Sequence, residues 1–304
     1  MHRVKIIIFF ATLTVLLCGA GYLLAGTSGV AVGLLGAIGL NFSLYRWSER
    51  VVLRLHEARE ITEAEAPDCL AITRALALRA GIPAPRLYAV DTLTPNAFAI
   101  GRSSQHASLV ITEGLLQRLD QDEWTSVIAH EVAHIKHRDI LVMTMTAALA
   151  GILSRPFASV IPQWPFLADP IPAGSKDGLR TAAGALASVI VTPLAAWSRL
   201  FHSRLREFEA DEASAWLTGD PLALVEALRK LDYWNQVTPM QVGSPVMAHL
   251  YTVNPFAWGK WAQGFDTHPS TVDRILLLEL IYHMHDGVTW PSGVSAELSL
   301  PKSA

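Results

Sequence analysis

Charged residues and cysteines are both scarce in this chain of 304 residues. Only 17% of the residues are charged, against about 25% in a typical soluble domain, and none lies between Lys5 and Arg46. The two cysteines, Cys18 and Cys69, are too few for a disulfide framework or a cysteine-rich metal site, which favours a reducing compartment. The net charge of -3 argues against nucleic acid as a partner.

The uncharged stretch near the amino terminus has the length and composition of a membrane segment. It contains two apolar runs, Ile6–Leu24 and Val30–Tyr45, on either side of the turn Ala25–Gly29, and crossing a bilayer takes about 20 residues. We therefore expect residues 1–46 to form a transmembrane hairpin. A cleaved signal peptide is the competing interpretation, because basic residues precede the first run. Basic residues flank the hairpin and are missing from its turn, which predicts that both ends face the cytoplasm.

Residues 47–139 are expected to form the first part of a cytoplasmic domain. The charged stretch His56–Pro67 is compatible with a helix and is interpreted as a solvated connector. Three short stretches then have the pattern of β-strands, namely Arg86–Val90, Ala97–Ile100 and Ser108–Thr112. They predict a small sheet, whose edge can hold an extended peptide by main-chain hydrogen bonds.

The stretch H-E-V-A-H, from His130 to His134, is the strongest functional signal. Asp120 and Glu123 form a variant of the capping-box start signal, so the motif is expected inside a helix. Two histidines four residues apart then project from one helix face and can bind a single Zn²⁺, while Glu131 acts as a general base. This arrangement is typical of a metallopeptidase.

A second pair of apolar runs follows, Ile140–Ser154 and Thr181–Trp197, in a region that spans residues 140–198. Each run is borderline in length for a membrane span, and basic residues flank the pair on the cytoplasmic side. We expect a second transmembrane hairpin. The alternative is that one or both runs are buried helices of the soluble domain. The catalytic histidines are cytoplasmic in either case, because an even number of crossings separates them from the amino terminus.

A catalytic zinc takes three protein ligands, so a third must come from another part of the chain. In the next region, residues 199–285, Glu207 and Asp211 are four apart and share a helix face, whereas Glu209 points away. We predict Glu207 as the third ligand and Asp211 as the carboxylate that orients a zinc-bound histidine. The alternative is an exposed acidic helix face balanced by neighbouring arginines.

Two further residues are candidates for contact with the oxyanion or the substrate. His268 either donates to the oxyanion of the tetrahedral intermediate or anchors the loop before the next helix. Asn96 precedes the strand along which we expect the substrate backbone to align. The remaining residues, 286–304, are expected to form a tail that matches no pattern.

Five motifs, in order, resemble the HtpX family of membrane zinc metallopeptidases, which is related to the CAAX prenyl proteases. They are N-A-F-A-I-G-R from Asn96, S-L-V-I-T-E-G-L-L from Ser108, H-E-V-A-H-I-K-H-R-D from His130, S-R-L-R-E-F-E-A-D ending at Asp211, and T-H-P-S-T-V-D-R-I from Thr267. The chain departs from the family pattern in its proline-rich loop between the hairpins, at Ser270, and in the tail.

The resemblance implies His130, His134 and Glu207 as ligands of one Zn²⁺ per chain, with Glu131 as the catalytic acid and base. It implies a multi-pass protein of the plasma membrane, which is the inner membrane in cells that have two. The catalytic domain is then expected to face the cytoplasm and to cleave misfolded or damaged membrane proteins. The expected fold is α+β, mainly α: a zincin-like domain of the gluzincin type with a small sheet, joined to two transmembrane hairpins. The expected partners are unfolded membrane polypeptides and the lipid bilayer, with the oligomeric state left open. A CAAX-type prenyl protease and a non-catalytic zinc-stabilised membrane scaffold are the alternatives.

Overall fold

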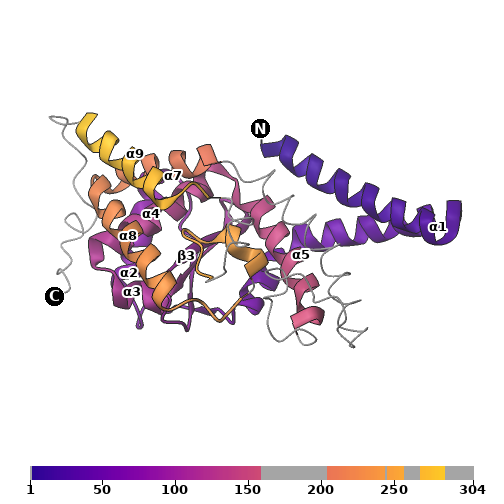
Figure 1. Ribbon diagram of the computed structural model, residues 1–304, viewed down its shortest axis with the longest axis horizontal. Helices are drawn as coiled ribbons and strands as arrows, with labels where there is room; N and C mark the ends of the chain where they lie inside the picture. Colours follow the sequence, from indigo (N-terminus) through magenta and orange to yellow (C-terminus); the bar gives the residue numbers. More distant parts are fainter. Residues whose placement is uncertain (1, 159–203, 244, 257–267, 285–304) are drawn as a thin grey trace, which may run out of the picture.

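A computed structural model describes residues 2–158, 204–243, 245–256 and 268–284. The chain begins with a long helix, α1 (His2–Leu55), and ends its described part with α9 (Thr271–Met284) (Figure 1). Between them the strands are β1 (Arg59–Glu60), β2 (Arg86–Val90), β3 (Ala97–Ser103) and β4 (His106–Thr112). The other helices are α2 (Pro67–Ala80), α3 (Glu113–Arg118), α4 (Gln121–His137), α5 (Ile140–Ala158), α7 (Arg204–Thr218), α8 (Pro221–Val237) and the 3₁₀ helix η2 (Pro245–Leu250).

Helix α1 is folded back on itself as a hairpin that projects from the body of the molecule (Figure 1). Its bend lies at Ala25 and Gly26, whose backbone angles are not helical, and Gly26 has φ 60°. The two arms approach closely, because a Cβ atom added at Gly21 would lie 2.1 Å from the carbonyl oxygen of Gly29. Asn41 also bridges the arms by donating to Thr14 Oγ1 at 3.1 Å. The expected helical hairpin and its turn are therefore present.

The surface of this hairpin is largely apolar. Many of its large apolar side chains are exposed, including Val15, Leu35 and Phe42. Among the described residues, Val4–Leu55 is the one helical segment that is both long and apolar enough to cross a membrane. The number of crossings, and the orientation of the hairpin, stay predictions.

The sheet is small and mixed, with the strand order β1-β2-β4-β3. Strands β2 and β4 run parallel, while β1 and β3 pair antiparallel at the two edges. The three predicted strands are observed, and β3 and β4 extend further than expected. Part of the stretch His56–Pro67, interpreted above as a connector, instead forms the short strand β1 beside β2. The chain is thus α+β and mainly helical.

Helix α4 is the central element of the body. It contacts α2, α7, α8 and strand β3, and every side chain from Trp124 to Ile135 is buried. Its start is stabilised by a complete capping box, in which Asp120 accepts from the Glu123 N–H and Glu123 accepts from the Asp120 N–H. This start signal was correctly predicted.

Helix α5 follows α4 closely and packs against α1, β3 and η2. Its side chains from Ile140 to Ala150 are buried within the protein. Because part of this burial is against α1 and part against β3 and η2, it agrees with a membrane helix packed on the hairpin as well as with a helix of the body, and the crossing by Ile140–Ser154 stays a prediction. The second run, Thr181–Trp197, lies outside the described residues, as does the tail 286–304.

Candidate metal centre

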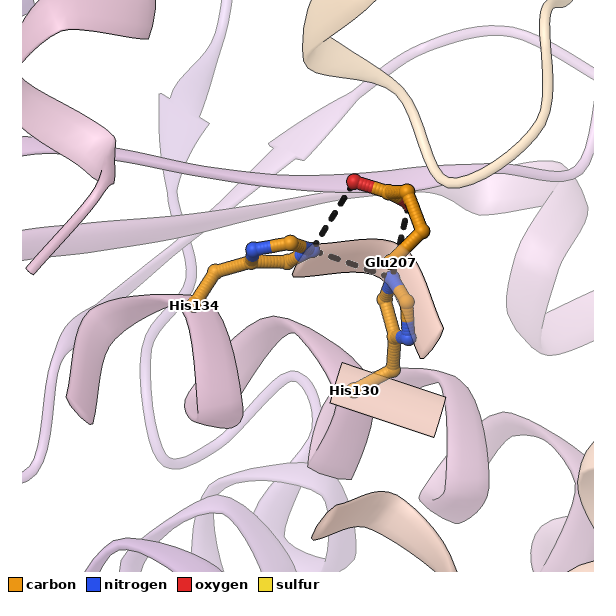
Figure 2. A group of neighbouring side chains, drawn as sticks. All are labelled: His130, His134 and Glu207. Carbon is orange, nitrogen blue, oxygen red and sulfur yellow. Dashed lines mark hydrogen bonds and ion pairs between the residues drawn. The ribbon is translucent and has the colours of Figure 1, made fainter. Parts of the chain in front are cut away.

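His130 and His134 both point from α4 toward Glu207 of α7 (Figure 2). Their Nε2 atoms are 3.2 Å apart, and each lies 3.6 Å from one oxygen of the Glu207 carboxylate. All three side chains are buried. The helix spacing brings the two histidines together, and the contact between α4 and α7 adds the carboxylate from 73 residues further along the chain.

Two more carboxylates hold the outer nitrogens of these imidazoles. Asp211 Oδ1 lies 2.9 Å from His130 Nδ1, and Asp139 Oδ2 lies 3.1 Å from His134 Nδ1. Asp211 thus contacts one of the histidines, as its predicted role requires. The contribution of Asp139 was missed by the sequence analysis, although it stands only five residues after His134 in the chain.

The arrangement calls for a cation. Because each Nδ1 faces a carboxylate, a neutral ring keeps its hydrogen there and directs the lone pair of Nε2 toward the other histidine and Glu207. Without a cation, the two Nε2 lone pairs would face each other and the Glu207 carboxylate, of which Oε2 has another nitrogen nearby, His268 Nδ1 at 2.9 Å. Donors at 2.0 to 2.2 Å from a tetrahedral metal lie about 3.3 to 3.6 Å apart, which agrees with the separations of 3.2 and 3.6 Å. The three residues therefore fit a metal ion.

The pKa values of both histidines are raised, which means that the site favours positive charge. Burial lowers the pKa of His134, but Asp139 and Glu207 outweigh it and raise the value to about 10. Burial and Arg274 likewise lower the pKa of His130, yet Asp211 and Glu207 leave it raised overall. Protons and a metal ion then compete for the same nitrogens, so metal binding would release protons.

Arg274 of α9 was not identified as a site residue from sequence. Its guanidinium is buried and binds Asp211 through two nitrogens, at 2.8 Å to Oδ2 and 2.6 Å to Oδ1. A third nitrogen donates to the carbonyl oxygen of Thr252 at 2.7 Å. A chain of contacts therefore runs from Arg274 through Asp211 to His130. The only sequence signal was its place in the T-H-P-S-T-V-D-R-I motif.

Glu131 follows His130 on α4 and is also buried. The hydroxyl of Thr252 lies 2.7 Å from its Oε1 atom. This neighbour was missed by the sequence analysis, because 121 residues separate the two positions.

The two remaining candidates differ in position. His268 lies inside the cluster, with its Nδ1 2.9 Å from Glu207 Oε2. Asn96 is fully buried, and its amide donates to the carbonyl oxygen of Val253 at 2.6 Å. That bond ties Asn96 to the segment that contains Val253. A contact between Asn96 and a substrate stays a prediction.

Strand β3 passes close to Glu131 and forms one edge of the sheet. In its antiparallel pairing with β4, Ala97, Ala99 and Gly101 direct their backbone groups away from the sheet. The carbonyl of Ala97 accepts from the Thr252 N–H, and the Gly101 N–H donates to the Thr144 hydroxyl. Ala99 lies between these two bonded positions.

The sequence is similar to known peptidases over most of its length. The model of Peptidase family M48 matches residues 63–281. A "Protease HtpX homolog" from Thermococcus kodakarensis is 41% identical, over 90% of this chain and 94% of that protein. One from Thermodesulfovibrio yellowstonii is 38% identical, over 92% and 98% respectively. The crystal structure of Ste24p from S. mikatae aligns with a TM-score of 0.49 and 18% identity, covering 88% of this chain and 62% of that one.

Proposed function

The chain belongs to peptidase family M48, among the HtpX proteases, and we propose that it is an integral membrane zinc endopeptidase that cleaves misfolded or damaged membrane proteins. Family membership makes it a metallopeptidase. The observation that carries the chemistry is the buried cluster of His130, His134 and Glu207 next to Glu131. We assign the first three as the ligands of one Zn²⁺ and the last as the catalytic acid and base.

Two nitrogens and one carboxylate are the donor set of many catalytic zinc sites, which keep a further position for water or substrate. A bound zinc ion supplies Lewis acidity, which polarises a carbonyl group and makes a water molecule more acidic. Asp211 and Asp139 bind the Nδ1 atoms of the two histidines and would keep their Nε2 atoms directed at a bound metal. Without these carboxylates the rings could rotate or bind through the wrong nitrogen.

Glu131 performs the proton transfers. Its carboxylate takes a proton from the attacking water and then delivers it to the nitrogen of the departing amine. His268, against Glu207, is our candidate for donating a hydrogen bond to the oxyanion that forms at the scissile carbonyl.

We propose that the substrate backbone pairs with the edge of β3 at Ala99, whose N–H and C=O face away from the sheet. Ala97 and Gly101 on either side already bond to Thr252 and Thr144, so Ala99 is the position left for pairing along these three residues. Ala99 is itself buried, and a substrate must displace the side chains that cover it. Backbone pairing of this kind is independent of side-chain identity, which suits cleavage of varied unfolded polypeptides.

The apolar hairpin supports attachment to a lipid bilayer. We propose a multi-pass protein of the plasma membrane, the inner membrane where there are two, with the body on the cytoplasmic side. The basic residues that flank the hairpin support this orientation.

The decisive experiment is cleavage of casein, an unfolded substrate, by zinc-loaded protein in detergent, beside Glu131→Gln. Glutamine keeps the size of the side chain and cannot accept the proton as a carboxylate does. We expect the variant to bind zinc normally and to lose cleavage, and chelation to abolish cleavage by the wild type. Cleavage by Glu131→Gln at the wild-type rate would refute the assigned role. Cleavage of prenylated peptides alone would favour a prenyl protease.

A further inference from the structure

Thr252 lies directly beside the proposed catalytic base. Its hydroxyl oxygen is 2.7 Å from Glu131 Oε1 and 3.1 Å from the carbonyl oxygen of Ala97. Thr252 is 1% exposed and Glu131 is 2% exposed, so the contact between them is buried. A hydroxyl carries a single hydrogen, which can be donated to only one of the two acceptors.

The carboxylate is the stronger acceptor. It is charged and closer, and a hydrogen bond to a charged group is roughly twice as strong as one between neutral groups. The carbonyl of Ala97, by contrast, already accepts from the backbone N–H of Thr252 at 3.1 Å. A buried carboxylate without a donor would also be costly. The hydroxyl hydrogen therefore belongs to Glu131.

The position of the hydroxyl is itself fixed from several sides. The backbone N–H of Thr252 is bonded to β3, and its carbonyl accepts from Arg274 Nη1 at 2.7 Å. The preceding residue, Tyr251, bonds through its hydroxyl to His56 Nε2 at 2.7 Å, at the end of α1. Threonine is branched at Cβ, which restricts its side chain to few rotamers. The donor is thus held rigidly while the carboxylate it faces is a flexible side chain.

We propose that Thr252 is a positioning residue for Glu131, and this inference rests on the proposed function. Its hydroxyl donates to Oε1 and holds the carboxylate in one orientation, which leaves Oε2 to take the proton of the attacking water. The partners of the Thr252 hydroxyl are Glu131 Oε1 and the Ala97 carbonyl, so the proposed role of this hydroxyl runs through Glu131. Misplacing a catalytic group by even about 1 Å can slow a reaction about 100-fold.

Three substitutions at this position separate the hydroxyl from the shape of the side chain. Thr252→Val keeps the shape and loses the hydroxyl, Thr252→Ser keeps the hydroxyl and loses the methyl group, and Thr252→Ala loses both. With a quenched fluorescent peptide that contains a bond cleaved in casein, we expect kcat to fall about 10- to 100-fold in the valine and alanine variants. We expect the serine variant to stay within about 3-fold of wild type, and KM and zinc content to change little in any of them.

The kcat values of the three variants, compared with one another, test whether Thr252 positions Glu131. A valine variant with wild-type kcat, or serine and alanine variants that are equally impaired, would show that the residue matters for packing and would overturn the positioning role. If the valine variant loses its cooperative thermal transition or its zinc, the serine and alanine pair still tests the hydroxyl, because both lack the methyl group. Wild-type protein that binds zinc but cleaves no more peptide than Glu131→Gln would overturn the proposed function itself.

Discussion

The α1 hairpin and helix α4 reverse the usual relation between polarity and burial. Leu23 and Leu24 near the tip of the hairpin are 85% and 87% exposed, whereas His130 and Glu131 on α4 are 0% and 2% exposed. In water both arrangements would be unfavourable, because apolar surface would be hydrated and ionisable groups would be desolvated. Each becomes favourable when a third component is present. Under the proposed function, a bilayer covers the hairpin and a metal ion compensates the buried donor atoms.

The two regions are stable for different reasons. The hairpin depends on its surroundings and holds its arms together by close backbone approach at Gly21 and Gly29. Helix α4 depends on partners within the chain, because Glu207, Asp211 and Asp139 surround its histidines. Substitutions around the α4 histidines should therefore affect metal binding and stability, whereas substitutions in the hairpin should affect membrane insertion. Four substitutions test this contrast.

The largest effect is expected from removing the third ligand. Glu207→Ala leaves two histidines to hold the metal, so we expect loss of most bound zinc and of all measurable cleavage. The matched control is Glu209→Ala on the same helix, because Glu209 is half-exposed and pairs with Arg206. Metal analysis of both variants measures the difference. Full zinc occupancy in Glu207→Ala would move the ligand to another carboxylate.

A smaller but still large effect is expected from Asp211→Asn, which keeps the shape and removes the charge. The buried guanidinium of Arg274 then loses its ionic partner, at a cost of about 3 to 5 kcal/mol in the free energy of unfolding. Weaker orientation of His130 should also reduce metal affinity by about 10- to 100-fold. Denaturation in detergent and competition with a chelator measure the two effects. The exposed neighbour Glu212 provides the control, since Glu212→Gln should change stability by less than about 0.5 kcal/mol.

The hairpin is tested by placing a charge on its surface. Leu35→Arg should raise the free energy of membrane insertion by about 2.5 to 3.5 kcal/mol, as measured with a glycosylation reporter. Leu35 is 71% exposed, and Leu78 on α2 is 81% exposed. Leu78→Arg should be nearly neutral, because Leu78 faces water. Equal tolerance at both positions would argue that the hairpin is not in a bilayer.

The smallest effect concerns His56, where the hairpin joins the body. Burial lowers the pKa of His56 from its ordinary 6.5 to about 4, although a hydrogen bond to the carbonyl oxygen of Val52 opposes the shift. The unfolded chain then binds the proton first, so stability should fall as the pH drops from about 6.5 toward 4, by at most ~3 kcal/mol. His56→Gln should flatten this part of the stability profile. The exposed His106 is the control, and His106→Gln should leave the slope unchanged.

Local patterns predicted the individual elements well. The capping box at Asp120 started α4, and the spacing of His130 and His134 placed their side chains on one helix face. The four-residue spacing of Glu207 and Asp211 put both carboxylates on the side of α7 that faces α4. These predictions succeeded because helix geometry is set by residues close in sequence. The choice of Glu207 over other carboxylates also depended on the H-E-V-A-H motif that precedes it in the chain.

Contacts between distant segments could not be predicted in this way. Strand β1 has only two residues, too few for any periodicity, and it exists because Arg59 and Glu60 lie beside β2. Thr252 and Arg274 carry no local signal for their contacts with Glu131 and Asp211. Each of these pairs forms only when several helices and the sheet have packed together.

The sequence by itself determined the candidates for the chemistry of this protein: the residues proposed to hold a metal, the one proposed to move a proton, and the segment apolar enough for a bilayer. These follow from residue type and spacing, which are properties of the chain. Only the tertiary structure decided which carboxylate faces which histidine and which hydroxyl lies beside Glu131. Those choices depend on how α4, α7, α9 and β3 meet, because a hydrogen bond requires its two atoms to lie within about 3 Å and sequence separation does not limit that distance.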